Sequence, residues 1–536
     1  MHANGHSLVD DSVKADRTAI DSTFWSHNSP PQPSNTNNLL QLSEADMRKF
    51  GYSVIDTIIE HSMLIKDKPV VNPADRQCME ALLRENLPQQ GTPWQQVFEQ
   101  TLWDVFTHMM YTDHPRFFGW VPGPSNFVSV MGDLLASGFN IFTGVWAVSP
   151  GPTQIEIIVL DWLKELVGCP KQAGGVLVSG GSVANLSGLA VARRIKLQEN
   201  TDKAVIYFST QTHWSNERAA QVLGFSSDQL RRIAVDADYR MDIESLERQI
   251  SIDRQAGLRP FCIIANAGTT NTGAIDPLAI LSRICEKEGL WLHVDGAYGV
   301  AACLSEEGKQ LLDGIEHAHS ITVDPHKWFF QPYEVGCLLV RDQNWLSETF
   351  NITGDYMRNL EEEFESINFY SKGIQLTRGN KALKLWMSLK IFGVDSFRAA
   401  VNSGIHMAKY AQSLWQNMES WQVTSPATLG VVTFRYAPEG ADEDYLEFFN
   451  DRVANAVAED KFAMVSTTRL NGKLVMRMCT INPRTTELDI AETVSRINRL
   501  AREMHNTDRN RQAILGLPGS AAGTIGYEKN KTGAHH

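Results

Sequence analysis

The sequence predicts an α/β protein in which a large domain is built on a mostly parallel sheet. From about residue 150, short runs rich in β-branched residues alternate with longer amphipathic stretches, as strands alternate with crossover helices. Amphipathic helical patterns precede this region, and a strand-rich pattern with a hairpin signal follows it. These observations predict an N-terminal helical arm, a large domain and a small C-terminal α+β domain.

Six apolar runs are the candidate strands of the large domain. Helical patterns such as ANLSGLAVARRIKL and LAILSRICEKEG separate several of them. Ligands of open α/β sheets bind at the carboxyl ends of the strands, so polar residues that follow these runs are candidate site residues. The candidate strands are residues 176–179, 204–209, 261–266, 290–295, 320–324 and 336–340.

Helix and turn signals organise the rest of the chain. Ser43 and Thr92 open amphipathic patterns, and Asn471-Gly472 between two strand patterns is typical of a hairpin. Residues 381–416 read as one long helix, and residues 420–505 as strand, helix, strand, strand, helix. The expected divisions are a disordered tail over 1–40, a helical arm over 41–118, the large domain over 119–396, the small domain over 397–508 and a flexible tail over 509–536.

Composition excludes several classes of protein. The 536 residues carry 49 Lys and Arg against 62 Asp and Glu, a formal charge of −13, which disfavours binding to nucleic acid or an anionic membrane surface. No apolar run is long enough to cross a membrane, and no secretory leader pattern is present. The seven cysteines are scattered without zinc-ligand spacing, so no metal site is expected. Cysteines of this kind are typical of a reducing compartment, so we expect a cytoplasmic location.

The first of three polar clusters at strand ends suits an anion. Ser179-Gly180-Gly181-Ser182 turns a strand into a helix, and the free N–H groups of a helix N-terminus bind phosphate. The pattern lacks the GK[ST] of a P-loop and the GxGxxG of a dinucleotide site. The alternative is that these residues only cap the helix.

The other two clusters carry an acid and an amine. Asp295 follows an apolar strand, and a buried aspartate needs a cationic partner; a carboxylate that caps the next turn is the alternative. Lys327 ends another strand beside His326 and Trp328, as suits an amine nucleophile that forms Schiff bases. The alternative for Lys327 is a structural lysine whose amine reaches solvent. Together the clusters predict one ligand that has a phosphate, a basic ring nitrogen and an aldehyde. Pyridoxal 5′-phosphate (PLP) has all three groups.

The motifs SGGSVANLSGL, QTHWSNERA, NAGTTNTGAIDPL, HVDGAYG and DPHKW occur in this order. Together with HPRFFGWVPGP, SPGPTQIEIIVLDWL and LTRGNKALKLW, they make the chain resemble the group II PLP-dependent decarboxylases of fold type I, especially the aromatic L-amino acid decarboxylases. The resemblance covers residues 45–505, roughly the whole chain without its tails. It implies a fold type I, transferase-like large domain that binds PLP, and a homodimer with the active site at the interface.

The resemblance also implies roles for single residues. Lys327 forms the Schiff base, Asp295 keeps the pyridine nitrogen protonated, and His213 stacks on the cofactor ring. Asp324 departs from the asparagine of the animal enzymes, and an ionised acid there repels phosphate, so we expect it to be paired, protonated or turned away. The expected cofactor-binding set is Gly181, Ser182, His213, Asn266, Asp295, Ala297, Asp324, His326 and Lys327.

By the same resemblance, Tyr356 is the proton donor that completes the catalytic set with Lys327, Asp295 and His213. The oxygen-using aldehyde synthases of the family have phenylalanine there, so the tyrosine favours formation of an amine. The expected substrate is L-tryptophan, L-phenylalanine, L-tyrosine or dihydroxyphenylalanine, a small molecule held by Trp120, Val121, Pro122, Phe142 and Tyr370.

Three other functions remain open at this point. The first is oxygen-dependent conversion of the amino acid to an aromatic acetaldehyde. The second is decarboxylation of an acidic amino acid; the sequence shows no arginine dedicated to a distal carboxylate, and Arg116 and Arg378 are the two left open for that role. The third is a binding scaffold without catalysis, which an intact set of Lys327, Asp295 and His213 disfavours.

Overall fold

The computed structural model describes residues 40–198, 200–351 and 367–515. It separates into two compact units, one of residues 1–63 with 88–100 and the other of residues 64–87 with 101–536. In the described part of the first unit, the helices are α2 (Glu44–Leu64), which runs one residue past the unit's boundary, and α4 (Trp94–Gln100). The ring of Phe50 lies 5.0 Å from that of Trp94 and 5.7 Å from that of Phe98, so the two helices pack through aromatic side chains.

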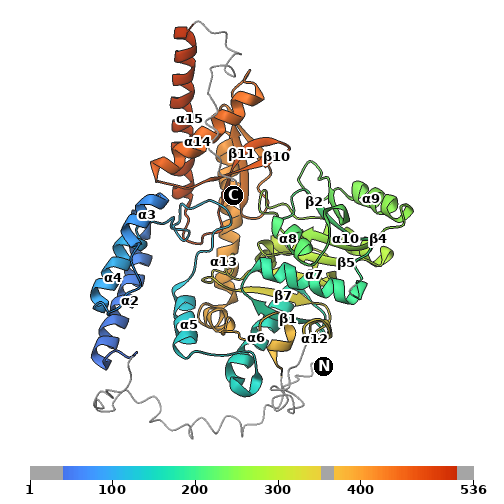
Figure 1. The fold of residues 1–536 in the computed structure, drawn as a ribbon. Helices are drawn as coiled ribbons and strands as arrows, with labels where there is room; N and C mark the ends of the chain where they lie inside the picture. The colour runs from blue at the N-terminus through green and yellow to red at the C-terminus, as the bar shows by residue number, and fades with distance from the viewer. Residues whose placement is uncertain (1–39, 199, 352–366, 516–536) are drawn as a thin grey trace, which may run out of the picture. The chain divides into compact units, whose positions relative to one another are not determined.

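The second unit contains a seven-stranded sheet (Figure 1). Strands β2 to β6 are parallel, whereas β7 is antiparallel to both of its neighbours, β1 and β6. The prediction of a mostly parallel sheet is confirmed. In spatial order the strands are β1 (Gly174–Val178), β7 (Gly336–Val340), β6 (Ser320–Val323), β5 (Trp291–Asp295), β4 (Arg259–Asn266), β2 (Ala204–Ser209) and β3 (Leu230–Ile233).

All six predicted strands are present, and β3 is an additional edge strand. Its sequence, Leu-Arg-Arg-Ile, is half polar because only one neighbour, β2, covers it, and so it lacks the apolar run of the buried strands. The central strands are buried along their whole length, except for the first two residues of β4. Their core side chains include Leu177, Ile206, Ile263 and Leu338, each with no exposed surface.

The helices of this unit surround the sheet and continue beyond it (Figure 1). Helix α7 packs across β4 to β7, and α6 packs against β1. The helices are α3 (Arg76–Leu83), α5 (Phe127–Gly138), α6 (Pro150–Val167), α7 (Gly181–Leu197), α8 (Trp214–Val222), α9 (Ile243–Gln255), α10 (Leu278–Glu288), α11 (Glu306–Leu311) and α12 (Asn344–Phe350).

The long helix predicted over 381–416 is α13 (Ala382–Gln416), with a kink at Gly393, whose φ of 72° suits glycine. After it, the second, antiparallel sheet has the order β10 (Ser466–Leu470), β11 (Lys473–Cys479), β9 (Val431–Tyr436), β8 (Trp421–Ser425). Helices α14 (Glu443–Asp460) and α15 (Glu487–Leu515) belong to the same region. Two strands therefore precede α14 where the sequence pattern predicts one, because Pro426 and the left-handed Leu429 break a run that reads as continuous.

Candidate active site

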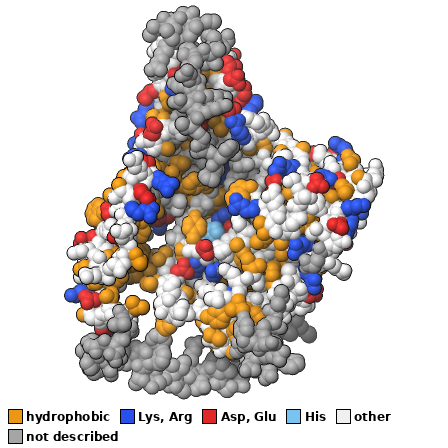
Figure 2. Space-filling model, viewed as in Figure 1, with side chains coloured by type: hydrophobic (Ala, Val, Ile, Leu, Met, Phe, Trp, Pro, Cys, Tyr) orange, Lys and Arg blue, Asp and Glu red, His pale blue; other side chains and the backbone are white. Residues whose placement is uncertain are grey.

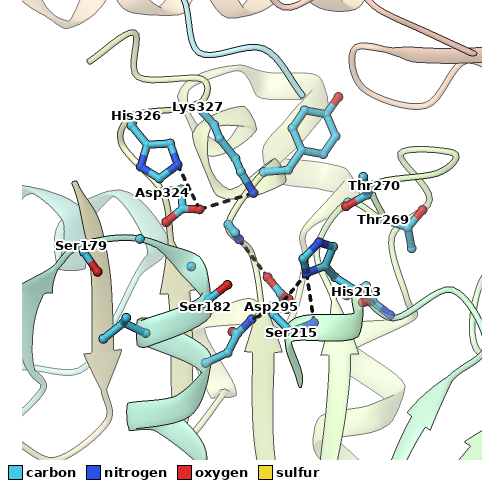
Figure 3. A pocket seen from close by; sticks show the side chains of 18 of the residues that line it. Ser179, Ser182, His213, Ser215, Thr269, Thr270, Asp295, Asp324, His326 and Lys327 are labelled. Carbon is cyan, nitrogen blue, oxygen red and sulfur yellow. Dashed lines mark hydrogen bonds and ion pairs between the residues drawn. The ribbon is translucent and has the colours of Figure 1, made fainter. Parts of the chain in front are cut away.

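A cavity of about 340 Å³ lies at the carboxyl ends of the parallel strands (Figure 3). Loops that are far apart in the sequence contribute to it. All nine predicted cofactor-binding residues are among those that line it: Gly181, Ser182, His213, Asn266, Asp295, Ala297, Asp324, His326 and Lys327. The polar strand ends that the sequence singled out therefore converge on one space.

The glycine-rich turn between β1 and α7 forms one wall of the cavity. A Cβ atom on Gly181 would lie 2.7 Å from Oδ2 of Asp324, and one on Gly180 would lie 3.1 Å from Cε1 of His326. Glycine at both positions therefore keeps the turn open. Helix α7 begins at Gly181, so its N-terminal dipole and the N–H groups of its first turn favour an anion here. We call Gly180, Gly181 and Ser182 the anion cradle.

Asp295, at the end of β5, is held by uncharged donors. Oδ2 accepts hydrogen bonds from Nδ2 of Asn185 at 2.9 Å and Nδ2 of Asn216 at 2.7 Å, and Oδ1 accepts one from the backbone of Ala297 at 3.3 Å. Burial by itself raises the pKa of Asp295, but Lys327, the neighbouring histidines and Asn216 outweigh it and hold that pKa below its usual value. The group is a buried carboxylate suited to a cationic ligand atom.

His213 caps the N-terminus of α8. Its Nδ1 accepts from the backbone N–H of Ser215 at 3.3 Å, which assigns the ring proton to Nε2 in the neutral form. Burial lowers the pKa of His213, while Asp295 opposes the shift. The cap fixes the ring against the cavity, where it can lie beside a planar ligand.

Lys327 reaches into the cavity from above Asp295 and His213 in the view of Figure 3. Its Nζ is 3.3 Å from Oδ2 of Asp324, and Nε2 of His326 is 3.5 Å from the same oxygen. Of the three states expected for Asp324, the structure has the paired one. The lysine amine is partly exposed to the cavity, with 24% of its side chain accessible, so a carbonyl carbon can reach it.

Sequence reasoning missed the residues that support these groups. Asn185 and Asn216 lie inside the motifs SGGSVAN and THWSN, but no pattern there shows that both amides reach Asp295. Asn266 was expected to touch the cofactor; its Nδ2 donates to Asp276 at 2.8 Å and to Thr212 at 3.0 Å. Other residues lining the cavity that were not predicted are Ser215, Gly268, Thr269, Thr270 and Glu334.

The five predicted substrate residues are not among those that line this cavity, and their role stays a prediction. Trp120 is 54% exposed, with its carbonyl held by Nη1 of Arg477 at 2.6 Å. Its segment continues toward the cavity, because a Cβ on Gly123 would lie 2.7 Å from the backbone oxygen of His326. Phe142 and Tyr370 pack together against Val145, and Val121 and Pro122 follow Trp120. Tyr356 lies outside the described residues.

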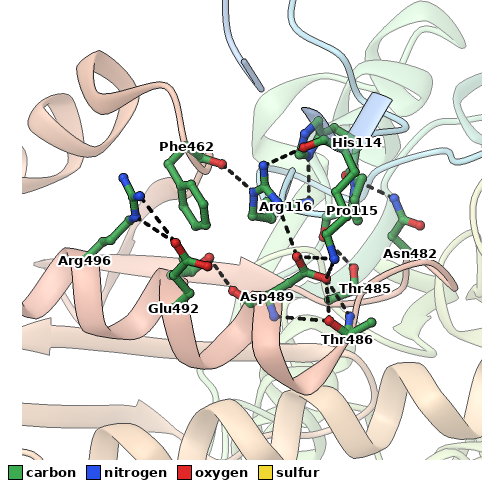
Figure 4. Close-up of polar contacts among 12 residues, drawn as sticks. His114, Pro115, Arg116, Phe462, Asn482, Thr485, Thr486, Asp489, Glu492 and Arg496 are labelled. Atoms are coloured by element: carbon green, nitrogen blue, oxygen red, sulfur yellow. Dashed lines mark hydrogen bonds and ion pairs between the residues drawn. The ribbon is translucent and has the colours of Figure 1, made fainter. Parts of the chain in front are cut away.

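Both arginines considered for an acidic substrate have carboxylate partners of their own. Arg378 forms a buried pair with Glu156, with Nη2 2.6 Å from Oε1. Arg116 donates to Asp489 at 3.4 Å and to the backbone oxygens of Lys66 and Phe462 (Figure 4). Neither lines the cavity.

The donor set of the cavity fits PLP. The anion cradle suits the phosphate, the buried carboxylate of Asp295 suits the pyridine nitrogen, and the amine of Lys327 suits the aldehyde. In the described part of the chain, no group of three or more His, Cys, Asp or Glu side chains is arranged to hold a metal ion. Fold and site thus define an enzyme that uses PLP.

The chain belongs to the pyridoxal-dependent decarboxylases. The conserved-domain model of that family matches residues 76–437, which is more than half of the chain. PLP is therefore its cofactor, and decarboxylation its class of reaction.

The alignments with individual relatives extend over nearly the whole length of those relatives. An aromatic-L-amino-acid decarboxylase of Bacillus atrophaeus is 45% identical over 467 residues, 87% of this chain and 97% of that protein. A phenylacetaldehyde synthase of Arabidopsis thaliana is 30% identical over 85% of this chain and 95% of its own. The crystal structure of Oryza sativa TDC with PLP and tryptamine superposes with a TM-score of 0.83 at 26% identity, covering 86% of this chain and 99% of that one.

Proposed function

We propose that this enzyme decarboxylates an aromatic L-amino acid to the corresponding arylalkylamine and CO₂. The observation that carries the proposal is the 45% identity to a relative named as an aromatic-L-amino-acid decarboxylase, over 97% of that relative. Arg116 pairs with Asp489, and Arg378 pairs with Glu156. These pairs support the proposal, because neither arginine is free to bind the distal carboxylate of an acidic substrate.

The residues of the cavity have separable tasks in this reaction. PLP, when bound, withdraws electrons from the carbon that loses CO₂. Lys327 would hold the cofactor through a covalent bond from its amine and would yield that bond to the substrate amine. Asp295, kept ionised by its surroundings, holds the proton on the pyridine nitrogen. His213 fixes the plane in which cofactor and substrate meet, and Tyr356 returns a proton to the carbon after CO₂ leaves.

The alternative product is an aromatic acetaldehyde, because one relative is a phenylacetaldehyde synthase. Tyr356 favours the amine, since a phenol placed at the reacting carbon supplies the proton that ends the reaction before oxygen intervenes. Incubation of the purified enzyme with all twenty amino acids plus dihydroxyphenylalanine tests both products. An arylalkylamine formed in equal amount to CO₂ is expected; peroxide and ammonia in that amount would select the aldehyde instead.

Tyr356→Phe should move the wild-type product from amine toward aldehyde, and an unchanged amine yield would remove Tyr356 from this role.

We further propose a homodimer, with the site completed at the interface. Support comes from α5 and α13, which pack together and expose large apolar side chains. Leu134 on α5 is 51% exposed and Ile391 on α13 is 60% exposed, as apolar side chains of an interface are before a partner covers them. Both signs of charge are interspersed with hydrophobic side chains on the face drawn in Figure 2, which suits a protein partner better than nucleic acid.

A cytoplasmic location is part of the same proposal. All seven cysteines are free thiols, five of them buried, as in reducing compartments. None of the helices in the described ranges combines the length and apolar character that a membrane crossing requires. The predicted division into tails, arm, large domain and small domain also stays a proposal.

A further inference from the structure

The carboxyl group of Asp324 stands at the anion cradle. Its Oδ2 would lie 2.7 Å from a Cβ on Gly181, the first residue of α7. The side chain is 3% exposed, and Oδ1 has no hydrogen-bond partner among the described residues. A phosphate held by the cradle therefore meets a buried carboxylate, and two anions at such a distance repel each other strongly.

The contact between Asp324 and His326 lacks a proton. Nδ1 of His326 lies 2.8 Å from the backbone oxygen of Val335, which only accepts, so Nδ1 carries the hydrogen. Burial lowers the pKa of His326, and in the neutral ring Nε2 is then a lone pair. That lone pair faces Oδ2 of Asp324 at 3.5 Å, so two acceptors meet unless one proton lies between them.

Lys327 relieves this arrangement only while its amine is free. Its Nζ is 3.3 Å from Oδ2 of Asp324 and compensates the carboxylate as an ammonium group. Among the described residues, the other titratable groups that interact with Asp324 are His213, His326, Tyr333 and Cys337, and none of these is a permanent cation. When the phosphate of the cofactor arrives, Asp324 gains an anion as a neighbour, and Lys327, bonded to the cofactor, would no longer be a free ammonium group.

We propose that Asp324 and His326 then hold one proton between them, so that capture of the cofactor takes up a proton from solvent and the phosphate no longer meets an uncompensated carboxylate. Asp324 thus serves as a positioning residue that is compatible with the phosphate only when this proton is present. The inference rests on PLP as the cofactor and adds a link between its binding and pH.

Calorimetry of PLP binding in two buffers of different ionisation enthalpy measures the proton uptake. Wild type should take up close to one proton more than Asp324→Asn, because an amide carries no negative charge that needs a proton, while Schiff-base formation contributes equally to both. The Kd for PLP should rise with pH more steeply in wild type, by up to about tenfold per pH unit. Glu439→Gln, which neutralises an exposed carboxylate outside the cavity, should behave as wild type. Pyridoxal, which has no phosphate, should not distinguish Asp324→Asn from wild type.

Equal proton uptake by wild type and Asp324→Asn overturns the proposal. If Asp324→Asn does not bind PLP, the phosphorus NMR resonance of the wild-type holoenzyme decides. A resonance displaced from that of the free dianion and moving with pH supports the shared proton, and a fixed dianion resonance overturns it. Failure of wild type to give a visible absorption band with PLP would contradict the cofactor itself, a result separate from either of these.

Discussion

Asn185 donates a hydrogen bond of 2.9 Å from Nδ2 to Oδ2 of Asp295. Its Oδ1 accepts from Nε2 of His293 at 3.0 Å and from Oγ1 of Thr322 at 2.6 Å. The amide of a residue on α7 therefore joins side chains of β5 and β6 and fixes the carboxylate that faces the pyridine nitrogen. Neither end of the amide can rotate without losing a buried partner.

Replacing Asn185 by alanine should weaken PLP binding and lower kcat. A hydrogen bond to a charged group contributes roughly 1.5–3 kcal/mol, which corresponds to about 10- to 150-fold in the Kd for PLP. Asn455→Ala, at an exposed asparagine of α14, is the matched control and should leave the Kd as it is. Spectroscopic titration with PLP measures both, and a Kd for Asn185→Ala equal to that of the control would contradict this role.

Glu156 and Arg378 form a buried ion pair beside Leu177 of β1. The side chain of Glu156 is 0% exposed and that of Arg378 is 2% exposed. Glu156 accepts from the backbone N–H of Leu177 at 3.3 Å, and Arg378 donates to its backbone oxygen at 2.8 Å. Arg378→Met should lower the free energy of unfolding by roughly 3–5 kcal/mol, because Glu156 is left buried without its cation.

Urea unfolding measures this effect. Arg469→Ala, which breaks an exposed pair with Glu447, is the control and should change the midpoint little. The double variant Arg378→Met with Glu156→Gln should recover part of the loss, since no charge then remains buried. A midpoint for Arg378→Met equal to that of Arg469→Ala would show that the pair does not stabilise β1.

The sequence predicted those parts of the site whose residues lie close together in the chain and form a recognisable local pattern. The apolar runs predicted six strands, and the polar residues at their ends predicted the anion cradle, Asp295 and Lys327. Partners that are far apart in sequence were not predictable, because spacing carries no information about them. Arg378 and Glu156 are separated by 222 residues, and Asn185 and Asp295 by 110. Edge strand β3 was missed because a strand with one neighbour needs no apolar run.

The proposed homodimer makes a prediction for the apolar side chains of α5 and α13. Ile391→Asp places a charge in the expected interface, and burial of an unpaired charge costs far more than the interface gains at that point. Sedimentation should show a monomer, or a dimer constant weakened by at least about 100-fold. Leu488→Asp, at a 70% exposed leucine of α15, is the control and should remain dimeric. A wild-type protein that sediments as a monomer at all concentrations would reject the dimer.

Stability should fall as the pH falls below neutral, because His293 is buried in its neutral form. Its Nδ1 accepts from Ser320 Oγ at 2.8 Å, and its Nε2 donates to Asn185, so the ring has no place for a second proton. Burial lowers the pKa of His293 from 6.5 to about 4, with Asp295 opposing the shift. The unfolded chain binds the proton first. The stabilisation is therefore complete above pH 6.5 and is lost progressively as the pH falls toward 4.

His293→Asn removes this titration and tests it directly. Between pH 6.5 and 4 the free energy of unfolding of wild type should fall more steeply than that of His293→Asn, by up to about 1.4 kcal/mol per pH unit for the one proton involved. Burial also raises the pKa of Asp276 to about 6, and this group acts with the opposite sign in both proteins, so it cancels in the comparison. His317→Asn, at an exposed histidine, controls for loss of an imidazole. Parallel slopes for wild type and His293→Asn would mean that the folded protein accommodates a charged His293, and with it a different arrangement of the hydrogen bonds that support Asp295.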